Sequence, residues 1–158
     1  VRGDALLASG VARAAALREV VAASGRARII VDRTGALGYE AGRAFGNEMM
    51  ARDERPDVIV CSTDMTAIGV LDAVRIDCGL DVPGEIGIAG FGDVPASAWA
   101  SHRLTTVRLP LERMIDEAVA TVLAEAAPPL TAPRLVVVGG DVVVRETLRA
   151  APPARSPV

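Results

Sequence analysis

The 158-residue sequence contains no lysine and few aromatic residues: one Trp, one Tyr and two Phe. All 17 cationic side chains are therefore Arg, and the 20 Asp and Glu residues outnumber them to give a net charge of −3. The Arg residues are scattered along the chain instead of forming one basic run. A chain that grips phosphates usually concentrates its cations on one face and offers rings for stacking on bases. The composition therefore argues against direct nucleic-acid binding by these residues.

Cysteine is also scarce, since only Cys61 and Cys78 are present. Two cysteines are too few for a disulfide framework, and these are too widely spaced for a zinc knuckle. We expect both to be small core residues in a reducing compartment, which favours a cytoplasmic location. No run approaches the roughly 20 apolar residues that span a bilayer, so no membrane association is expected.

The motifs of common enzymes are missing from the chain. There is one His, no Gly-x-Ser-x-Gly, no Gly-x-Gly-x-x-Gly that opens a helix after the first strand, and no phosphate loop that ends in Lys. A catalytic constellation cannot be assembled from what remains. We therefore expect no enzymatic activity, no cofactor and no metal site.

The chain does have a regular alternation of strand and helix patterns. Two unbroken apolar runs, 57–61 and 86–91, bracket a helical segment at 65–77 and predict a βαβ unit. Further predicted elements are helices at 12–24, 39–53 and 112–126, a short buried strand at 27–31, a short extended crossing segment at 104–107, and one or two strands within 135–145. The Pro-rich end from residue 150 is expected to be disordered. The alternation predicts an α/β fold with a mostly parallel open sheet and helices on both faces, in three layers.

Small polar residues follow the two strands of the βαβ unit. Ser62, Thr63 and Asp64 come after the first strand, and Gly92 and Asp93 come after the second. Ligands of open parallel sheets bind beyond the carboxyl ends of the strands, so these residues are the first place to expect a site. Simpler roles compete with ligand contact, because Thr63 or Asp64 can cap the following helix and Asp93 can cap its own loop.

Short motifs spread over nearly the whole chain carry a family resemblance through their order and spacing. They are Arg13 with Gly25 twelve residues on, Pro56-Asp57, Thr63-Asp64-Met65-Thr66-Ala67-Ile68-Gly69, Val82-Pro83, Gly90-Phe91-Gly92-Asp93, Leu104-Thr105-Thr106-Val107 with Pro110, and Val144-Arg145-Glu146. The chain resembles the effector-binding core of lactose-repressor/galactose-repressor (LacI/GalR) transcription regulators. The resemblance implies a periplasmic-binding-protein-like core in which the effector lies between two lobes.

The same resemblance implies how the chain is divided. Residues 1–149 would form mainly the C-terminal lobe, together with the crossing segments and a helix at 112–126 that belongs to the other lobe. Val1 to Asp4 reads like the end of a strand and its loop, which suggests a larger protein cropped at the front. The N-terminal DNA-binding domain and most of the first lobe would then lie outside this chain. A secretion signal cut away before Val1 stays an alternative.

The resemblance also assigns an effector site to particular positions. These are Leu7, Ser9, Arg13, Arg33, Thr63, Asp64, Gly92 and Asp93. Arg33 stands where relatives often carry an aromatic residue, and Gly92 stands where many carry an Asp that binds sugar hydroxyls. For Arg13 and Arg33 the competing reading is a solvated surface arginine. Two cations near the site and one missing carboxylate predict an effector with an anionic group, such as a sugar acid or a sugar phosphate.

A homodimer is implied as well. The candidate interface residues are Met65, Ile68 and Leu71 on the helix after Asp64, and Trp99 and His102 in the segment 94–103. Packing inside the chain is the competing reading for each of them.

The predicted function is ligand sensing in a bacterial transcription regulator. Binding of a sugar or sugar acid would close the two lobes about segments 93–95, 109–110 and 133–134, and would thereby change operator binding through the missing N-terminal domain. The alternative is a periplasmic solute-binding protein of a sugar transporter, which uses the same fold. The motifs at 104–107 and Val144-Arg145-Glu146 favour a regulator. A sugar-modifying α/β enzyme is a more distant alternative without an evident acid–base pair.

Overall fold

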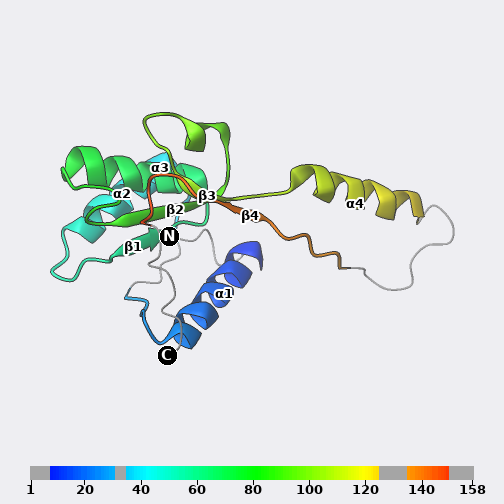
Figure 1. The fold of residues 1–158 in the computed structure, drawn as a ribbon, viewed down its shortest axis with the longest axis horizontal. Helices are drawn as coiled ribbons and strands as arrows, with labels where there is room; N and C mark the ends of the chain where they lie inside the picture. Colours follow the sequence, from blue (N-terminus) through cyan, green and yellow to red (C-terminus); the bar gives the residue numbers. More distant parts are fainter. Residues whose placement is uncertain (1–7, 31–34, 125–134, 150–158) are drawn as a thin grey trace, which may run out of the picture.

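A four-stranded sheet forms the centre of the protein, in a computed structural model that describes residues 8–30, 35–124 and 135–149 (Figure 1). The strand order is β1-β2-β3-β4. β1 (Val58–Val60) pairs in parallel with β2 (Gly87–Gly92), and β2 pairs in parallel with β3 (Thr105–Arg108), whereas β4 (Asp141–Val143) is antiparallel to β3. The predicted mostly parallel α/β sheet is confirmed. The segment predicted as an extended crossing at 104–107 is a full member of the sheet.

Two helices cover one face of this sheet. α2 (Tyr39–Met50) packs on α3 (Asp64–Asp72), and α3 packs on β2. The predicted helix at 65–77 is present, with its last part widened into a π-helical turn, η1 (Ala73–Asp77). The core lies between these helices and the sheet and contains Phe45, Met49, Met50, Ile59, Cys61, Ala67, Ile68, Val70, Leu71, Val74, Val82, Ile86, Ile88 and Leu104.

α1 (Ala8–Ser24) forms a looser layer on the other side of the sheet, where Leu17 and Val21 line a cavity beside β1 (Figure 1). It ends before Gly25, whose φ of 60° is the left-handed conformation expected of a helix stop. The Arg13 guanidinium of α1 lies over the Phe91 ring, 4.3 Å from its centroid. Val58 and Val60 of β1 keep 49% and 44% of their surface exposed, so this layer covers the sheet incompletely.

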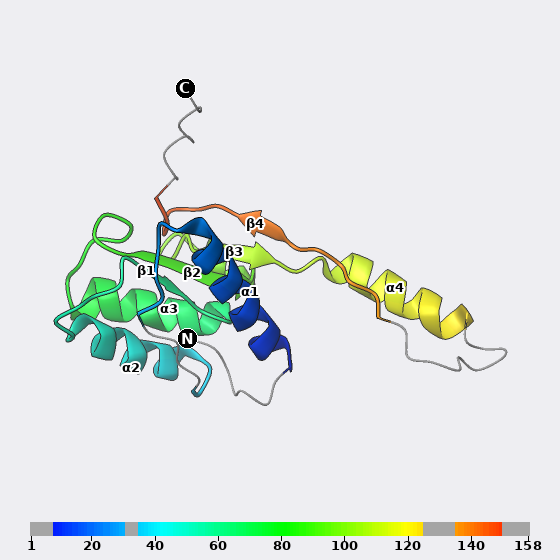
Figure 2. The same cartoon turned by 90° about the horizontal axis from the view of Figure 1, so that it is seen from below.

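The predicted helix at 112–126 is present as α4 (Leu111–Ala124), which projects away from the sheet (Figures 1 and 2). All six of its large apolar side chains are exposed: Leu111, Met114, Ile115, Val119, Val122 and Leu123. Leu135 and Val137, which precede β4, are 87% and 83% exposed. We call α4 and residues 135–140 the projecting arm. No helix in the described ranges is long and apolar enough to cross a lipid bilayer.

The short strand predicted at 27–31 is not formed over residues 27–30, and Val31 lies outside the described residues. Instead, an ion pair between Arg28 and Glu54 ties this segment to the turn before β1. A cavity of about 650 Å³ separates the segment from β1 and is walled by apolar groups that include Leu17 and Phe45. The prediction was wrong because an apolar run becomes a strand only by hydrogen-bonding to a neighbouring strand, and residues 27–30 line the cavity beside β1 instead of pairing with it.

The prediction that both cysteines are core residues is half right. Cys61 is 2% exposed at the end of β1, and burial raises the pKa of its thiol to about 11, which keeps it protonated and unreactive. Cys78 is exposed, because η1 ends just before it and turns its side chain outward. Its thiol lies 3.5 Å from the Asn47 side-chain oxygen.

Glycines let α2 and α3 approach each other backbone to backbone. A Cβ at Gly69 would lie 2.0 Å from the Tyr39 carbonyl oxygen, and a Cβ at Gly42 would lie 2.1 Å from the Thr66 carbonyl oxygen. Neither distance is possible for real atoms, so the two helices would have to separate to admit a methyl group. The close contact places the start of α3 firmly against the sheet.

Gly69→Ala should therefore lower the free energy of unfolding by about 1–3 kcal/mol, the usual cost of overpacking. Urea unfolding followed by circular dichroism would measure the change. Gly35→Ala is the matched control, since a Cβ at Gly35 meets nothing within 4 Å. Equal effects of the two substitutions would contradict the proposed helix contact.

Candidate functional site

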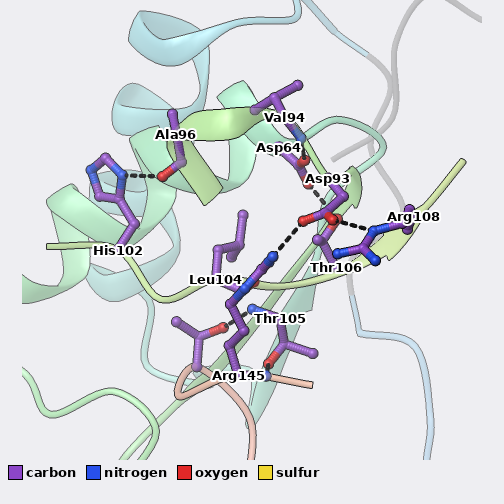
Figure 3. Close-up of polar contacts among 11 residues, drawn as sticks. Asp64, Asp93, Val94, Ala96, His102, Leu104, Thr105, Thr106, Arg108 and Arg145 are labelled. Atoms are coloured by element: carbon purple, nitrogen blue, oxygen red, sulfur yellow. Dashed lines mark hydrogen bonds and ion pairs between the residues drawn. The ribbon is translucent and has the colours of Figure 1, made fainter. Parts of the chain in front are cut away.

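The carboxyl ends of three parallel strands meet at one edge of the sheet. β1 leads into Ser62 and Thr63, β2 leads into Asp93, and β3 leads into Leu109 and Pro110. Ligands of open α/β sheets bind at this edge. Figure 3 shows the polar contacts gathered there.

Thr63 is the N-cap of α3. Its backbone is extended, with φ −143° and ψ 153°, and its hydroxyl oxygen accepts a hydrogen bond from the Thr66 amide at 3.4 Å. The hydroxyls of Thr63 and Thr66 are 2.9 Å apart, and the Gly38 amide donates to the Thr66 hydroxyl at 3.0 Å. The capping role that the sequence predicted for Thr63 or Asp64 thus belongs to Thr63.

Asp64 joins three chain segments that meet at this edge. The residue is 1% exposed, and its two carboxylate oxygens accept hydrogen bonds from the Val94 amide at 2.8 Å and from the Thr106 hydroxyl (Figure 3). A Cβ at Gly90 would lie 2.3 Å from one of these oxygens, so only glycine leaves room for the carboxylate. Asp64 therefore holds the loop after β2 against β3.

Asp93 is held between two guanidinium groups. Arg145 donates to one carboxylate oxygen at 2.6 Å, and Arg108 donates through Nε to the other at 2.6 Å (Figure 3). The Asp93 side chain is 8% exposed. Burial by itself raises the pKa of Asp93, but the hydrogen bonds from Arg145 and Arg108 outweigh it and leave the pKa below its usual value. The φ of Asp93 is 55°, in the left-handed region, and its carboxylate accepts from the two guanidinium groups, whereas the amide of the next residue, Val94, donates to Asp64.

Arg145 ties the C-terminal segment to this edge. Besides Asp93, its guanidinium donates to the Leu104 carbonyl at 2.7 Å, and its backbone amide donates to the Thr105 hydroxyl at 2.9 Å. Sequence reasoning missed Arg145 and Arg108 as site residues. A usable signal existed for Arg108, since it directly follows the predicted extended segment 104–107, and the end of a parallel strand lies at the ligand-binding edge.

Arg13 reaches the same edge from α1. One terminal nitrogen donates to the Ser62 carbonyl at 2.8 Å, while the guanidinium plane covers Phe91. The structure therefore places Arg13, Thr63 and Asp93 around the ends of β1 and β2. Leu7 and Arg33 lie outside the described residues, and Ser9 lies in the first turns of α1.

Gly92 ends β2 with a φ of 137°, a conformation that L side chains rarely adopt. A Cβ there would also lie 3.4 Å from a carboxylate oxygen of Asp64. Backbone strain and a second carboxylate beside Asp64 would both oppose an Asp at this position. The local backbone thus gives a physical reason for Gly92.

Residues 2–148 match the model of the periplasmic binding protein-like domain family. The chain belongs to this family. It is 36% identical over 116 residues to the HTH-type transcriptional regulator MalR of Streptomyces coelicolor, a match that covers 73% of this chain and 33% of MalR. It is 35% identical over 86 residues to the lactose operon repressor of Rhizobium radiobacter, covering 54% of this chain and 74% of that protein.

Solved structures agree with this assignment. The complex of the transcriptional regulator CelR with cellobiose superimposes on 93% of this chain and 45% of that chain, with a TM-score of 0.82 and 24% identity. That likeness shows the fold. The sequence matches confirm the LacI/GalR resemblance, and the chain is a LacI-family periplasmic binding protein-like core that spans about a third of the length of MalR.

The candidate interface residues of this LacI-family core divide into two groups. Ile68 and Leu71 are 2% and 0% exposed, and their side chains pack in the core beneath α2. They are therefore core residues and not surface residues of an interface. Met65 is 42% exposed and Trp99 is 60% exposed. His102 stacks on Trp99 with ring centroids 5.8 Å apart, and its Nδ1 lies 2.9 Å from the Ala96 carbonyl oxygen.

The cavity between α1 and β1 is not the candidate site. It runs along the edge of β1, and its lining combines apolar residues such as Leu17 and Phe45 with charged residues that include the paired Arg28 and Glu54. The strand ends of the periplasmic binding protein-like core carry the converging charges and hydrogen bonds instead. We therefore place the site at the carboxyl-terminal edge of the sheet.

The ion pairs of Asp93 give a testable pH dependence. Because the folded-state pKa of Asp93 lies below its ordinary value of about 3.9, its contribution to stability is present above that value and is lost as the pH falls through the folded-state pKa. Asp93→Asn should lower stability at pH 7 and flatten its fall in acid, as measured by urea unfolding at pH 7, 5, 4 and 3.

The flattening should be partial, because hydrogen bonds from Arg43 and Asn47 lower the pKa of Asp77 to about 2 and give it the same acid dependence. Asp53→Asn, at an exposed position after α2, is the control and should leave the profile unchanged. An Asp93→Asn profile parallel to the wild type would show that the Arg145 and Arg108 contacts do not stabilise the charged carboxylate.

Proposed function

We propose that this chain is the effector-sensing core of a LacI-type transcription regulator. A small sugar-like molecule with an anionic group binds at the carboxyl-terminal edge of the sheet and changes the affinity of a dimer for operator DNA. The observation that carries the proposal is Arg13, which α1 delivers to the ends of β1 and β2, against Ser62 and Phe91. The regulator names of MalR and the lactose operon repressor support it.

The exposed apolar surface of the projecting arm is an argument for a second lobe. Its apolar side chains, such as Ile115 and Leu123, are 61% and 71% exposed, which is unusual for a helix that has no further partner. We assign α4 to the other lobe. Segments 93–95 and 109–110 join the sheet to its flanking parts and serve as hinges, with 133–134, outside the described residues, as the third.

The mechanism rests on differential affinity. An effector that prefers one arrangement of the lobes shifts the population toward it, and only by the difference between its two binding free energies. In the proposed site, Arg13 and Arg33 contact the anionic part of the effector, while Thr63, Ser9 and Leu7 line the remainder. Asp64, Gly92 and Asp93 shape the edge.

The partners of the intact protein are proposed to be a second copy of the chain and operator DNA, with the dimer contact near Met65, Trp99 and His102. The DNA contact would come from an N-terminal domain outside these residues. A cytoplasmic location follows from that partner. The relatives are transcription regulators and not enzymes, which agrees with the missing catalytic motifs.

Arg13→Ala should weaken effector binding at least about tenfold, because a charged hydrogen bond contributes about 1.5–3 kcal/mol. The measurement is the effector concentration that changes operator binding by the intact protein, with sugars, sugar acids and sugar phosphates as candidates. Arg18→Ala, on an exposed position of the same helix, is the control and should leave that concentration unchanged.

Peptide sequencing of the intact native protein tests the class of the protein itself. A helix-turn-helix before these residues supports the regulator. A cleaved secretion signal in its place would make this chain a transport receptor and would overturn the proposal.

A further inference from the structure

Arg108 presents an unused guanidinium edge at the candidate site. It is the last residue of β3, and its side chain is 57% exposed. Its Nε donates to Asp93 at 2.6 Å, whereas its two terminal nitrogens make no hydrogen bond or ion pair with the part of the chain that the structure describes. A guanidinium held only through Nε still offers two parallel N–H donors to a carboxylate or a phosphate.

The anchor of Arg108 is itself rigid. Asp93 is 8% exposed, and Arg145, which is 13% exposed, holds the opposite carboxylate oxygen at 2.6 Å. One carboxylate thus lies between two guanidinium groups, so the cluster carries a net positive charge. Because the side chain of Arg108 is already fixed by this contact, less conformational entropy is lost when it binds a ligand.

The neighbouring strands leave room beside Arg108. Its Cα partner on β2 is Gly92, which has no side chain, and the backbone there disfavours any other residue. Its Cα partner on β4 is Asp141, which is exposed and makes no ion pair with Arg108 among the described residues. The terminal nitrogens are therefore accessible at the same edge as Asp93 (Figure 3).

We propose that Arg108 binds the anionic group of the effector, a carboxylate or a phosphate, through its two terminal nitrogens. Asp93 and Arg145 are positioning residues that fix its orientation. This inference rests on the proposed sensing function and adds Arg108 to the arginines that recognise the charged part of the ligand.

Isothermal titration calorimetry on the intact protein tests the inference with four anionic probes and two neutral sugars. D-glucuronate and D-galacturonate present a carboxylate, D-glucose 6-phosphate and inorganic phosphate present a phosphate, and D-glucose and D-galactose serve as neutral references. At least one anionic probe should bind the wild type more tightly than the neutral sugars do. Which anion binds distinguishes carboxylate recognition from phosphate recognition.

Arg108→Gln should weaken binding of that anion at least about tenfold. Arg108→Lys should lie in between, because it keeps the charge and loses the planar fork. Wild-type affinity should fall with added salt, and the Arg108→Gln affinity should fall less steeply.

Arg103→Gln is the matched control. Arg103 is 50% exposed and donates through Nε to Glu146 at 2.9 Å, as Arg108 does to Asp93, but it precedes β3 at the opposite end of the strand. Its removal should leave anion affinity unchanged. If Arg108→Gln does not fold by circular dichroism, Arg108→Lys carries the test, and wild-type affinity in that variant would overturn the inference.

Equal affinity in Arg108→Gln and Arg103→Gln overturns the inference, as does a wild type that binds none of the anions. The proposed function fails separately. If a neutral sugar changes operator binding in an Arg13-dependent way, the sensing function stands and only the role of Arg108 is lost. If nothing in the screen changes operator binding, the sensing function itself is contradicted.

Discussion

The buried carboxylate of Asp64 is the contact on which the geometry of this core depends. It accepts from the amide of Val94 and from the hydroxyl of Thr106, residues 30 and 42 positions away in the chain. A buried carboxylate is costly unless its oxygens are satisfied, so the site is stable only when α3, the loop after β2 and β3 are all in place. Parallel pairing brings the three strand ends to one edge, and Asp64 fixes how α3, the loop after β2 and β3 lie there relative to one another.

Asp64 and Asp93 divide two tasks between them. Asp64 accepts only from neutral donors and is closed to solvent, so it fixes the frame of the edge. Asp93 accepts from two cations, one of which, Arg108, is largely exposed. Asp64 therefore sets where the loop after β2 lies, and Asp93 sets how the Arg108 guanidinium is oriented at the surface of this edge.

Much of this fold is legible in the sequence because two of its strands are encoded by unbroken apolar runs, although Val58 and Val60 of β1 keep about half of their surface exposed. The runs at 57–61 and 86–91 predict β1 and β2, and the polar residues after them mark the edge correctly. The sequence predicted β3 only as a crossing segment, because Thr105 and Thr106 are polar and look like surface residues. Both are buried, and they hydrogen-bond to Thr147 and Asp64. The segment at 27–31 failed for the converse reason: its apolar residues fit a strand, but pairing depends on a partner edge that local pattern does not describe.

The sequence predicted where the candidate site residues lie better than it predicted what their side chains contact. A carboxylate at residue 64 or 93 can meet a ligand or a neighbour, and the choice depends on residues such as Arg145, 52 positions from Asp93. No local spacing encodes such a pair. Arg13 is a different case, because the family resemblance assigned it to the effector site and its side chain lies at that edge of the sheet, against Ser62 and Phe91.

The chain leaves the sheet through β3 and returns through β4, and these two strands pair in antiparallel from Thr106–Val143 to Arg108–Asp141. The projecting arm is thus attached by a ribbon of two hydrogen-bonded strands and not by two independent linkers. Such a ribbon bends across its flat face more readily than within its plane, where bending would stretch the ladder of hydrogen bonds. The pairing of β3 with β4 therefore sets the direction in which the arm can bend relative to the sheet. Bending in that direction moves the end of β3 that carries Arg108.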